Sequence, residues 1–297
     1  MNRKWTVVIV LAFLILGVTV WLGGAERKKV LEVGDSDVFR YASDGVVDVG
    51  SLYHYHYSTI DGKQKHDLYM YIKEEKQIQY LAAAYSIYQG LHLFTLTFQE
   101  HLVVNALAEN LLQDLKLPSS VVKSEGIYDY EKKQFSTKQI VWDKRGERKI
   151  GGGVLPFRII PTFEYSMEGM DLGHTFRFLD EQAKELLVGL SVMGQCVDMD
   201  VRYANDEMIG GIMTRKYHLR GRGILAKLFK VGIDVWIARD DPRRYMVKYV
   251  GYLRRYPYFE DVKIELQGVS KMKNTEWEQF LADQVKKAKA YLQPEEM

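Results

Sequence analysis

The chain has 297 residues, of which 47% are hydrophobic, so it is long enough for one large domain or two small ones with a substantial core. The formal net charge is +2, but Arg3 and Lys4 are the only charged residues among the first 25, which leaves 39 of the 41 basic residues against 39 acidic ones. This neutral balance argues against a nucleic-acid-binding protein. The single cysteine, Cys196, excludes an intramolecular disulfide.

Residues 1–25 predict a membrane-targeting segment. Arg3 and Lys4 precede an uncharged, mostly apolar run of 18 residues, Trp5 to Leu22, which small residues follow. This order is typical of a secretory signal peptide, although the apolar run is longer than the usual core of about 7–15 residues. Because such a length suffices to span a bilayer, we favour an uncleaved anchor over a cleaved signal peptide. Either way, the rest of the chain is expected to be exported.

Residues 26–44 are polar and irregular and indicate a short tether, and a β-rich exported domain is expected over residues 45–272. Its clearest element is a hairpin, because alternating runs at 53–57 and 66–72 flank Asp61-Gly62, a pair typical of a two-residue loop. Counting outward from that loop pairs His56 with Asp67. One face of the hairpin then carries Tyr53, Tyr55, Tyr57, Leu68, Met70 and Ile72, and the other carries His54, His56, Asp67, Tyr69 and Tyr71.

Further alternating runs predict strands at 77–84, 91–98, 135–142, 186–192 and 196–201, and an antiparallel meander of strands at 231–238, 246–253 and 262–267. Residues 102–117 lack this alternation and indicate a helix, and the glycines and prolines of 150–175 indicate a long loop across the sheet. Residues 273–297 predict an amphipathic helix that a capping box at Thr275–Glu278 begins. The expected fold is mainly β: one strongly curved antiparallel sheet, an open or half barrel, of about eight to eleven strands with one or two helices packed on its concave face.

Catalytic motifs are weak throughout. Ser191 lies in a smooth strand alternation, Asp198 and Asp200 suit a solvated strand face beside Arg202, and the glycine pattern from Gly221 lacks the preceding buried strand of a dinucleotide site. We therefore expect no catalytic residues, no cofactor and no enzymatic activity.

A metal site is the alternative that the hairpin leaves open. His54, His56 and Asp67 could together form a His-His-Asp site on one face. We favour the plainer interpretation, a cross-strand hydrogen bond between His56 and Asp67, and expect no metal.

Charge is segregated late in the chain. Twelve Lys and Arg residues between 212 and 255 face only three Asp residues, an excess that could attract anionic lipid headgroups. The alternative is a solvated outer face that the acidic 164–207 region compensates.

The run Val235-Trp236-Ile237-Ala238-Arg239-Asp240-Asp241-Pro242-Arg243-Arg244, followed by Met246-Val247-Lys248-Tyr249-Val250, resembles the end of an uncharacterised family of exported bacterial β-proteins. Residues 173–176 resemble a preceding section of that family. The resemblance implies an architecture similar to periplasmic lipoprotein and lipid carriers, whose curled sheet surrounds an apolar cavity. It also implies a bacterial cell-envelope location, either anchored in the inner membrane or secreted to the periplasm. The 99–118 segment and the C-terminal helix depart from that architecture, and either could plug the cavity.

These observations predict a non-enzymatic cell-envelope protein that binds a lipid or another hydrophobic ligand in the concave face. The expected apolar contacts are Tyr53, Tyr55, Tyr57, Leu68 and Met70, with Arg220 and Arg222 at the rim. One alternative is a structural or assembly protein that docks another envelope component through its C-terminal helix. A metal-dependent enzyme is a further alternative.

Overall fold

The computed structural model describes residues 46–83, 91–99, 102–115, 120–129, 132, 134–143, 146–156, 161–164, 185–192, 195–221, 232–255 and 258–293. The predicted membrane segment 1–25, the tether 26–44, residues 173–176 and Arg222 lie outside these ranges. No helix within the described ranges has the length and apolar character needed to cross a bilayer.

One sheet of fifteen strands makes up most of the described molecule. The first eight strands are β1 (Ser51–Thr59), β2 (Lys65–Glu74), β3 (Gln77–Ala83), β4 (His92–Gln99), β5 (Leu102–Asn110), β6 (Ser120–Asp129), β7 (Gln134–Asp143) and β8 (Gly146–Pro156). The other seven are β9 (Pro161–Glu164), β10 (Glu185–Val192), β11 (Gln195–Ile209), β12 (Ile212–Gly221), β13 (Gly232–Ala238), β14 (Met246–Arg255) and β15 (Tyr258–Lys271).

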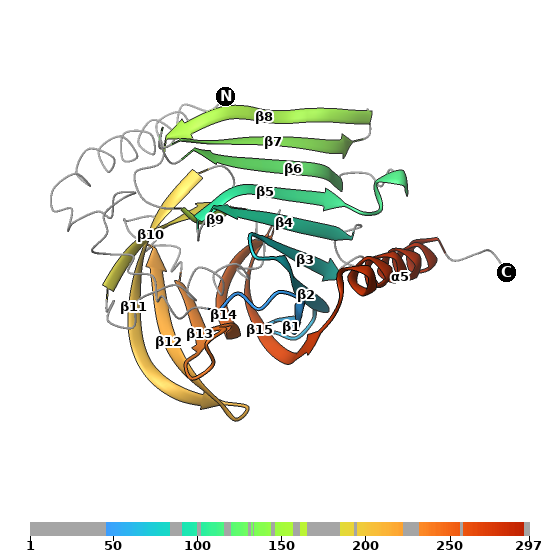
Figure 1. Cartoon of the computed structure of the whole chain (residues 1–297). Coiled ribbons are helices and arrows are strands. Elements are labelled where there is room, and N and C mark those ends of the chain that lie inside the picture. Colours follow the sequence, from blue (N-terminus) through green and yellow to red (C-terminus); the bar gives the residue numbers. More distant parts are fainter. Residues whose placement is uncertain are drawn as a thin grey trace.

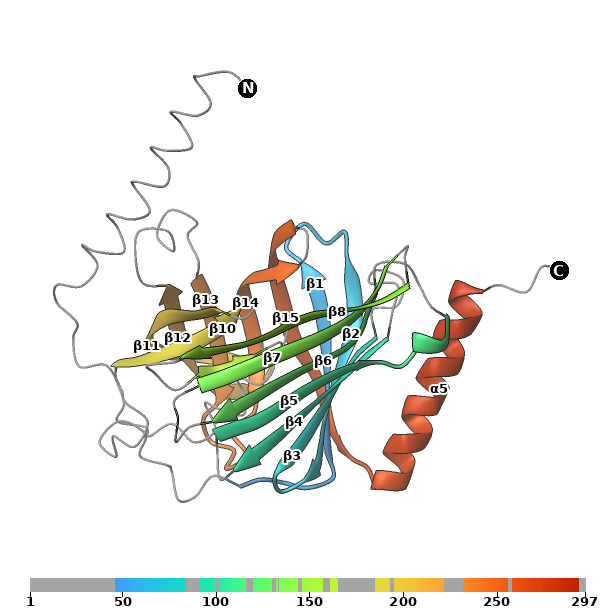
Figure 2. The ribbon, with the colours of Figure 1, turned by 90° about the horizontal axis from the view of Figure 1, so that it is seen from above.

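The strand order runs from β8 down to β1 and continues through β15 down to β9, so β1 pairs with β15 and joins the two halves. Pairing is antiparallel everywhere except between β9 and β10, which run parallel. Figures 1 and 2 show the sheet curling strongly, and β9 returns to contact β5. Because β8 and β9 remain the two outer strands of the order, the sheet is curved but open. The expected class, a single strongly curved antiparallel sheet, is confirmed.

The sheet has more strands than the eight to eleven expected, because two segments were assigned wrongly from the sequence and residues 120–129 and 212–221, which form β6 and β12, were not assigned to strands. Residues 102–110 form β5, and only Gln113–Leu115 forms a short 3-10 helix. Here the buried alternate positions are the small residues Ala106 and Ala108, so the period-2 pattern carries little hydrophobic contrast. Residues 150–156 likewise continue β8, and 161–164 form β9. Glycine and proline are tolerated there because β8 is an edge strand.

The one α-helix of the described residues, α5 (Asn274–Leu292), packs on the convex face and not on the expected concave face (Figure 1). Its buried Trp277 and Leu281 join Tyr71, Leu81 and Leu93 in one apolar cluster. Strands β2 to β4 are therefore apolar on both faces, and the outer face offers the helix a docking patch. Neither α5 nor β5 plugs the concavity.

The helix begins one residue before the predicted cap. Asn274 is its first residue, and the carboxylate of Glu276 accepts a hydrogen bond of 2.7 Å from the Lys273 backbone N–H. Glu278, which was predicted to close the capping box, instead pairs with Lys73 at 3.1 Å. That pair ties the first turn of the helix to β2.

Candidate functional site

The register of the first hairpin is confirmed residue by residue. His56 lies opposite Asp67, and Tyr55 lies opposite Leu68. The loop differs from the prediction: Thr59 N–H donates to Gln64 O at 3.0 Å, so four residues and not two connect the paired ends. Gly62 within it adopts a φ of +68°, in the left-handed region that favours glycine.

The candidate site is the inner, concave face of the sheet. Three tyrosines that alternate along β1, Tyr53, Tyr55 and Tyr57, point to it and are at most 1% exposed, and Leu68 and Met70 of β2 lie beside them. These five predicted contacts belong to one apolar cluster that continues over β1 to β5 and β12 to β15. The structure therefore brings together all five apolar residues that the sequence nominated.

Polar and aromatic contacts hold the tyrosine rings in place. The Tyr55 hydroxyl donates to the Met246 carbonyl at 3.0 Å, across 191 residues of sequence. The Tyr53 and Tyr245 rings lie 5.3 Å apart at 45°, and Tyr57 stacks on His66 at 4.0 Å. Buried tyrosines usually have such partners. Here the rings are held by the start of β14, at Met246, and by His66 near the start of β2.

Toward β5 and β6 the inner face carries smaller side chains. Ala106 pairs with Gly126, and Ala108 pairs with Ser124, which is 3% exposed. Short side chains permit close backbone approach, and β5 is the strand that β9 contacts. The concavity is thus lined by large rings at β1 and by small residues at β5 and β6.

The candidate metal ligands lie together on the outer face, and their hydrogen bonding differs from the prediction. His54 Nε2 lies 3.0 Å from Asp67 Oδ1, whereas His56 Nδ1 lies 3.6 Å from the same oxygen. The hydrogen bond therefore joins His54, not His56, to Asp67, and His54 also stacks on Tyr69 at 4.7 Å. Within the residues that the structure describes, no group of three or more His, Cys, Asp or Glu side chains is arranged to hold a metal ion.

The predicted rim residue Arg220 lies on the outer face of β12, opposite to the tyrosine row. Its Nη2 donates to Asp234 Oδ1 at 2.8 Å, and His218 Nδ1 lies 2.7 Å from the same oxygen. Burial alone would raise the pKa of the Asp234 carboxyl, but the hydrogen bonds from His218 and Arg220 lower it below its ordinary value. Arg220 is therefore engaged in a charge cluster and is not brought to the apolar site.

Other basic residues of the 212–255 region also have acidic neighbours. Arg215 and Arg239 pair with Asp206, which belongs to the acidic stretch expected to compensate them, and Lys248 pairs with Glu265. Several of the described cations are therefore neutralised by contacts within the sheet. The excess counted from the sequence overstates the positive field at this surface.

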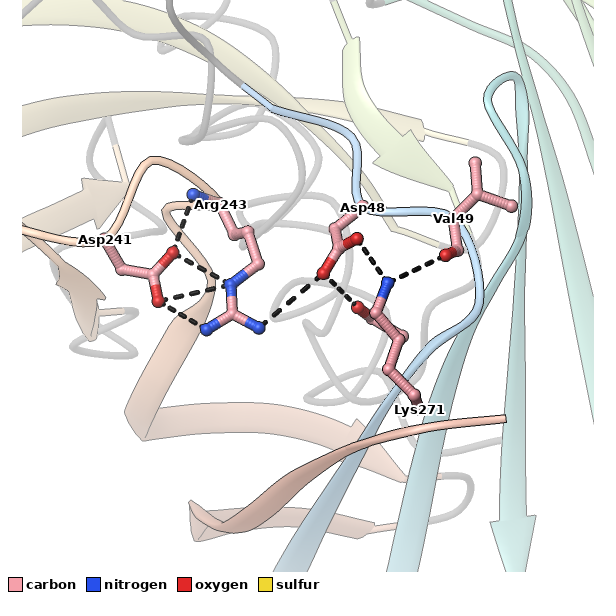
Figure 3. A network of polar contacts seen from close by, with 6 residues as sticks. Asp48, Val49, Asp241, Arg243 and Lys271 are labelled. Carbon is pink, nitrogen blue, oxygen red and sulfur yellow. Dashed lines mark hydrogen bonds and ion pairs between the residues drawn. The ribbon is translucent and has the colours of Figure 1, made fainter. Parts of the chain in front are cut away.

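One polar network was missed by the sequence interpretation (Figure 3). Asp48 accepts from Ser51 Oγ at 2.8 Å, binds Lys271 Nζ, and lies 3.7 Å from Arg243 Nη1. Arg243 in turn donates to Asp241 at 2.6 Å. The hydrogen bond from Lys271 is the main reason why the pKa of the Asp48 carboxyl lies below its ordinary value.

This network fixes the entering chain across one end of the concavity. Lys271 Nζ also donates to Val49 O at 2.9 Å, and Val46 N–H donates to Pro242 O at 3.1 Å. The Arg243 guanidinium lies 5.4 Å from the Tyr245 ring, which contacts Tyr53. Of this network, the sequence indicated only the Asp240–Arg243 turn, because no local pattern identifies Asp48 as a partner of that turn.

Comparisons with known proteins give a limited result. No family model and no curated protein matches the chain. A β-barrel-like protein of the domain of unknown function DUF1849 from Brucella abortus is 8% identical with a TM-score of 0.34, and the match covers 77% of this chain and 100% of that one.

Two further solved structures resemble the chain at a similar level. A putative outer membrane lipoprotein-sorting protein domain from Vibrio parahaemolyticus is 10% identical with a TM-score of 0.21, covering 80% of this chain and 91% of that one. A DUF1329 family protein from Desulfovibrio piger is 9% identical with a TM-score of 0.20, covering 75% and 86%. Likenesses of this size leave the function of the chain to be argued from its own residues.

Proposed function

We propose that this protein is a non-enzymatic cell-envelope protein that holds a lipid or another hydrophobic ligand between the walls of its curved sheet. The observation that supports this proposal is the continuous apolar inner face, on which the rings of Tyr53, Tyr55 and Tyr57 form a row. Lipid chains are bound by such apolar, aromatic concave surfaces with few polar groups.

The burial of these rings defines how a ligand would enter. Tyr53, Tyr55 and Leu68 are at most 2% exposed, so a ligand reaches them only if the walls of the concavity part. Neighbouring strands resist parting because they share hydrogen bonds. Among the strand pairings of the described residues, none joins β9 to β5, although the two are in contact. Opening along β5 and β9 therefore breaks no ladder and is the least costly route to the inner face.

Docking of another protein through α5, the alternative, has less support. Trp277 and Leu281 are buried against the chain's own sheet, so the apolar stripe of the helix is already used. A partner would meet the polar side of the helix, which carries residues such as Glu278 and Lys287. We therefore retain ligand binding as the function.

Lipid analysis tests the proposal directly. The full chain, purified from membranes in mild detergent, is extracted with organic solvent, and its lipids are compared with those of an unrelated anchored protein prepared in the same way. The delipidated protein is then irradiated with a photoactivatable fatty acid. We expect cross-links to map to peptides that contain residues 53–57 and 68–72.

The control is the same irradiation in urea, which should abolish the preference for these peptides. If the native protein carries no enriched lipid and the probe modifies only outer-face peptides such as those of α5, the inner face is a core alone and the proposal fails.

A further inference from the structure

The hairpin between β11 and β12 ends in an exposed apolar tip. Residues 208–213, Met-Ile-Gly-Gly-Ile-Met, contain no charge, and Met208 is 59% exposed. Gly210 and Gly211 have φ angles of +55° and +83°, the left-handed pair that a tight two-residue hairpin loop requires. A Cβ atom at either glycine would meet nothing within 4 Å, so the two loop residues are open to solvent.

The tip reaches beyond its neighbouring strands. Pairing of β12 with β13 begins at Thr214, and Figure 1 shows the hairpin extending past the ends of β13 and β14. Ile209 and Ile212, which flank the two glycines, pack against the inner apolar cluster. The apolar inner face thus extends to the end of this hairpin, and Met208, one pair further from the loop, is exposed to solvent.

The acidic residues next to the tip have polar partners within the sheet. Asp206 pairs with Arg239 at 2.9 Å and with Arg215 at 4.0 Å, and the Glu207 carboxylate accepts from Trp236 Nε1. Bringing the tip to an interface therefore carries no carboxylate without a hydrogen-bond or ion-pair partner among these two. Arg215 and Arg239 lie just behind the apolar residues and are held by acidic neighbours, Arg239 also by Asp240 at 2.6 Å.

The entering chain lies at the same end of the molecule. Arg239 N–H donates to Met213 O at 2.9 Å, and Val46 N–H donates to Pro242 O three residues further along that turn. Val46 and Val49 are 45% and 46% exposed. The predicted membrane segment, residues 5–22, therefore leads into the structure beside the apolar tip. Two independent features, the exposed tip and the point of chain entry, mark the same end.

We propose that this end of the molecule docks on a lipid bilayer, with the Met208–Met213 tip inserted at the boundary between headgroups and acyl chains. The linker of 23 residues before Val46 is long enough to let either end face the membrane, so the apolar tip determines the orientation. This inference does not depend on a ligand in the concavity, and the two proposals succeed or fail separately.

Site-directed spin labelling of the full chain in phosphatidylethanolamine–phosphatidylglycerol vesicles tests the orientation. All variants carry Cys196→Ser, and each adds one label site: Met208→Cys or Val49→Cys at the docking end, or Ile60→Cys as the control. Ile60 is a matched control because it is also 59% exposed. It follows Thr59, the far end of β1, which lies roughly 27 Å from Ser51 at about 3.4 Å per residue.

Accessibility to oxygen and to a water-soluble nickel chelate is then measured for each label. We expect the Met208 label to lie about 5–10 Å deep, as an interfacial apolar residue does, the Val49 label to lie at headgroup level, and the Ile60 label to remain aqueous. Equal aqueous exposure of the Met208 and Ile60 labels overturns the proposal. So does dipolar broadening between Met208 labels of two molecules, which would make the tip a contact between copies. If Met208→Cys does not fold, Val49→Cys against Ile60→Cys decides the question.

Discussion

The indole Nε1 of Trp277 in α5 donates a hydrogen bond of 2.6 Å to the side-chain Oε1 of Gln79 in β3, across 198 residues of sequence. Trp277 is fully buried, and its ring stacks on Tyr71 at 4.9 Å. Tyr71 in turn donates to Asn274 Oδ1 at 2.7 Å, at the start of the helix. Strands β2 and β3, which carry Tyr71 and Gln79, and the first turns of α5 therefore form one packed unit on the convex face.

Replacement of Trp277 tests that unit. Trp277→Ala should lower the free energy of unfolding by about 3–5 kcal/mol, the cost of removing a buried indole. Trp277→Phe should cost less, about 1–3 kcal/mol, because it mainly leaves the buried Gln79 oxygen without its donor. Urea unfolding followed by circular dichroism measures both.

Lys287→Ala on the exposed side of the same helix is the matched control and should change stability by less than about 0.5 kcal/mol. A Trp277→Ala protein as stable as the Lys287→Ala protein would mean that α5 is dispensable for the fold, and would return the helix to the role of a free docking element.

Two glycines in neighbouring strands should respond oppositely to alanine. A Cβ atom at Gly251 of β14 would lie 2.8 Å from Ile233 Cα and 2.9 Å from Gly232 O, both backbone atoms of β13. Gly251→Ala should therefore destabilise the protein by about 1–3 kcal/mol through overpacking. At Gly268 of β15 the added Cβ meets nothing within 4 Å, so Gly268→Ala should be neutral or slightly stabilising. Thermal unfolding of the two variants side by side checks the contrast, and equal effects would contradict the close approach of β13 and β14.

Local patterns predicted those elements whose two faces differ in chemistry. In the first hairpin, tyrosines alternate with His54 and His56, and only one register keeps the rings on one side. The meander of β13 to β15 alternates as regularly, and its strands lie where the sequence placed them. The turn at Asp241 was equally visible, because its carboxylate accepts from the Arg243 backbone N–H two residues later.

The sequence could not predict features that depend on what faces a residue across the fold. The inward positions of β5 are Ala106 and Ala108, so the strand looked helical. The outer face of β2 to β4 is apolar, but only the packing of Trp277 shows that a helix covers it. Asp48 and Lys271 are 223 residues apart, and no local rule pairs them.

Acid should weaken the contact between Asp48 and Lys271. Because the folded-state pKa of Asp48 lies below its ordinary value, its contribution to stability is full above the unfolded pKa of about 3.9 and is lost as pH falls through the folded pKa. Asp48→Asn should cost about 1 kcal/mol at pH 7, and its stability should converge with that of the unaltered protein as pH falls through the folded pKa of Asp48.

Urea unfolding across pH 2–7 measures this convergence. Lys271→Met, which removes the main cause of the lowered pKa, should shift the acid limb toward higher pH. A difference between Asp48→Asn and the unaltered protein that stays constant down to pH 2 would show that the carboxylate is not held in its ionised form by this network.

Two buried leucines of equal chemistry distinguish a ligand-binding face from a plain core. Leu68 lies on the inner face and is 2% exposed, and Leu81 lies on the outer face under α5 and is 1% exposed. Either Leu→Ala change should cost about 2–5 kcal/mol, because each leaves an apolar cavity. If the inner face admits hydrophobic ligands, a medium-chain fatty acid such as decanoate should restore part of the stability of Leu68→Ala.

The size of that recovery follows from mass action: a ligand at 100 times its dissociation constant stabilises the folded state by about 2.7 kcal/mol. Leu81→Ala should gain nothing beyond the small effect of decanoate on the unaltered protein, because its cavity is sealed between α5 and β3. Urea unfolding of both variants, with and without decanoate, gives the comparison. Equal recovery of the two variants would mean that decanoate acts on the protein generally, and no recovery of Leu68→Ala would mean that the tyrosine row encloses a core that does not open to ligands.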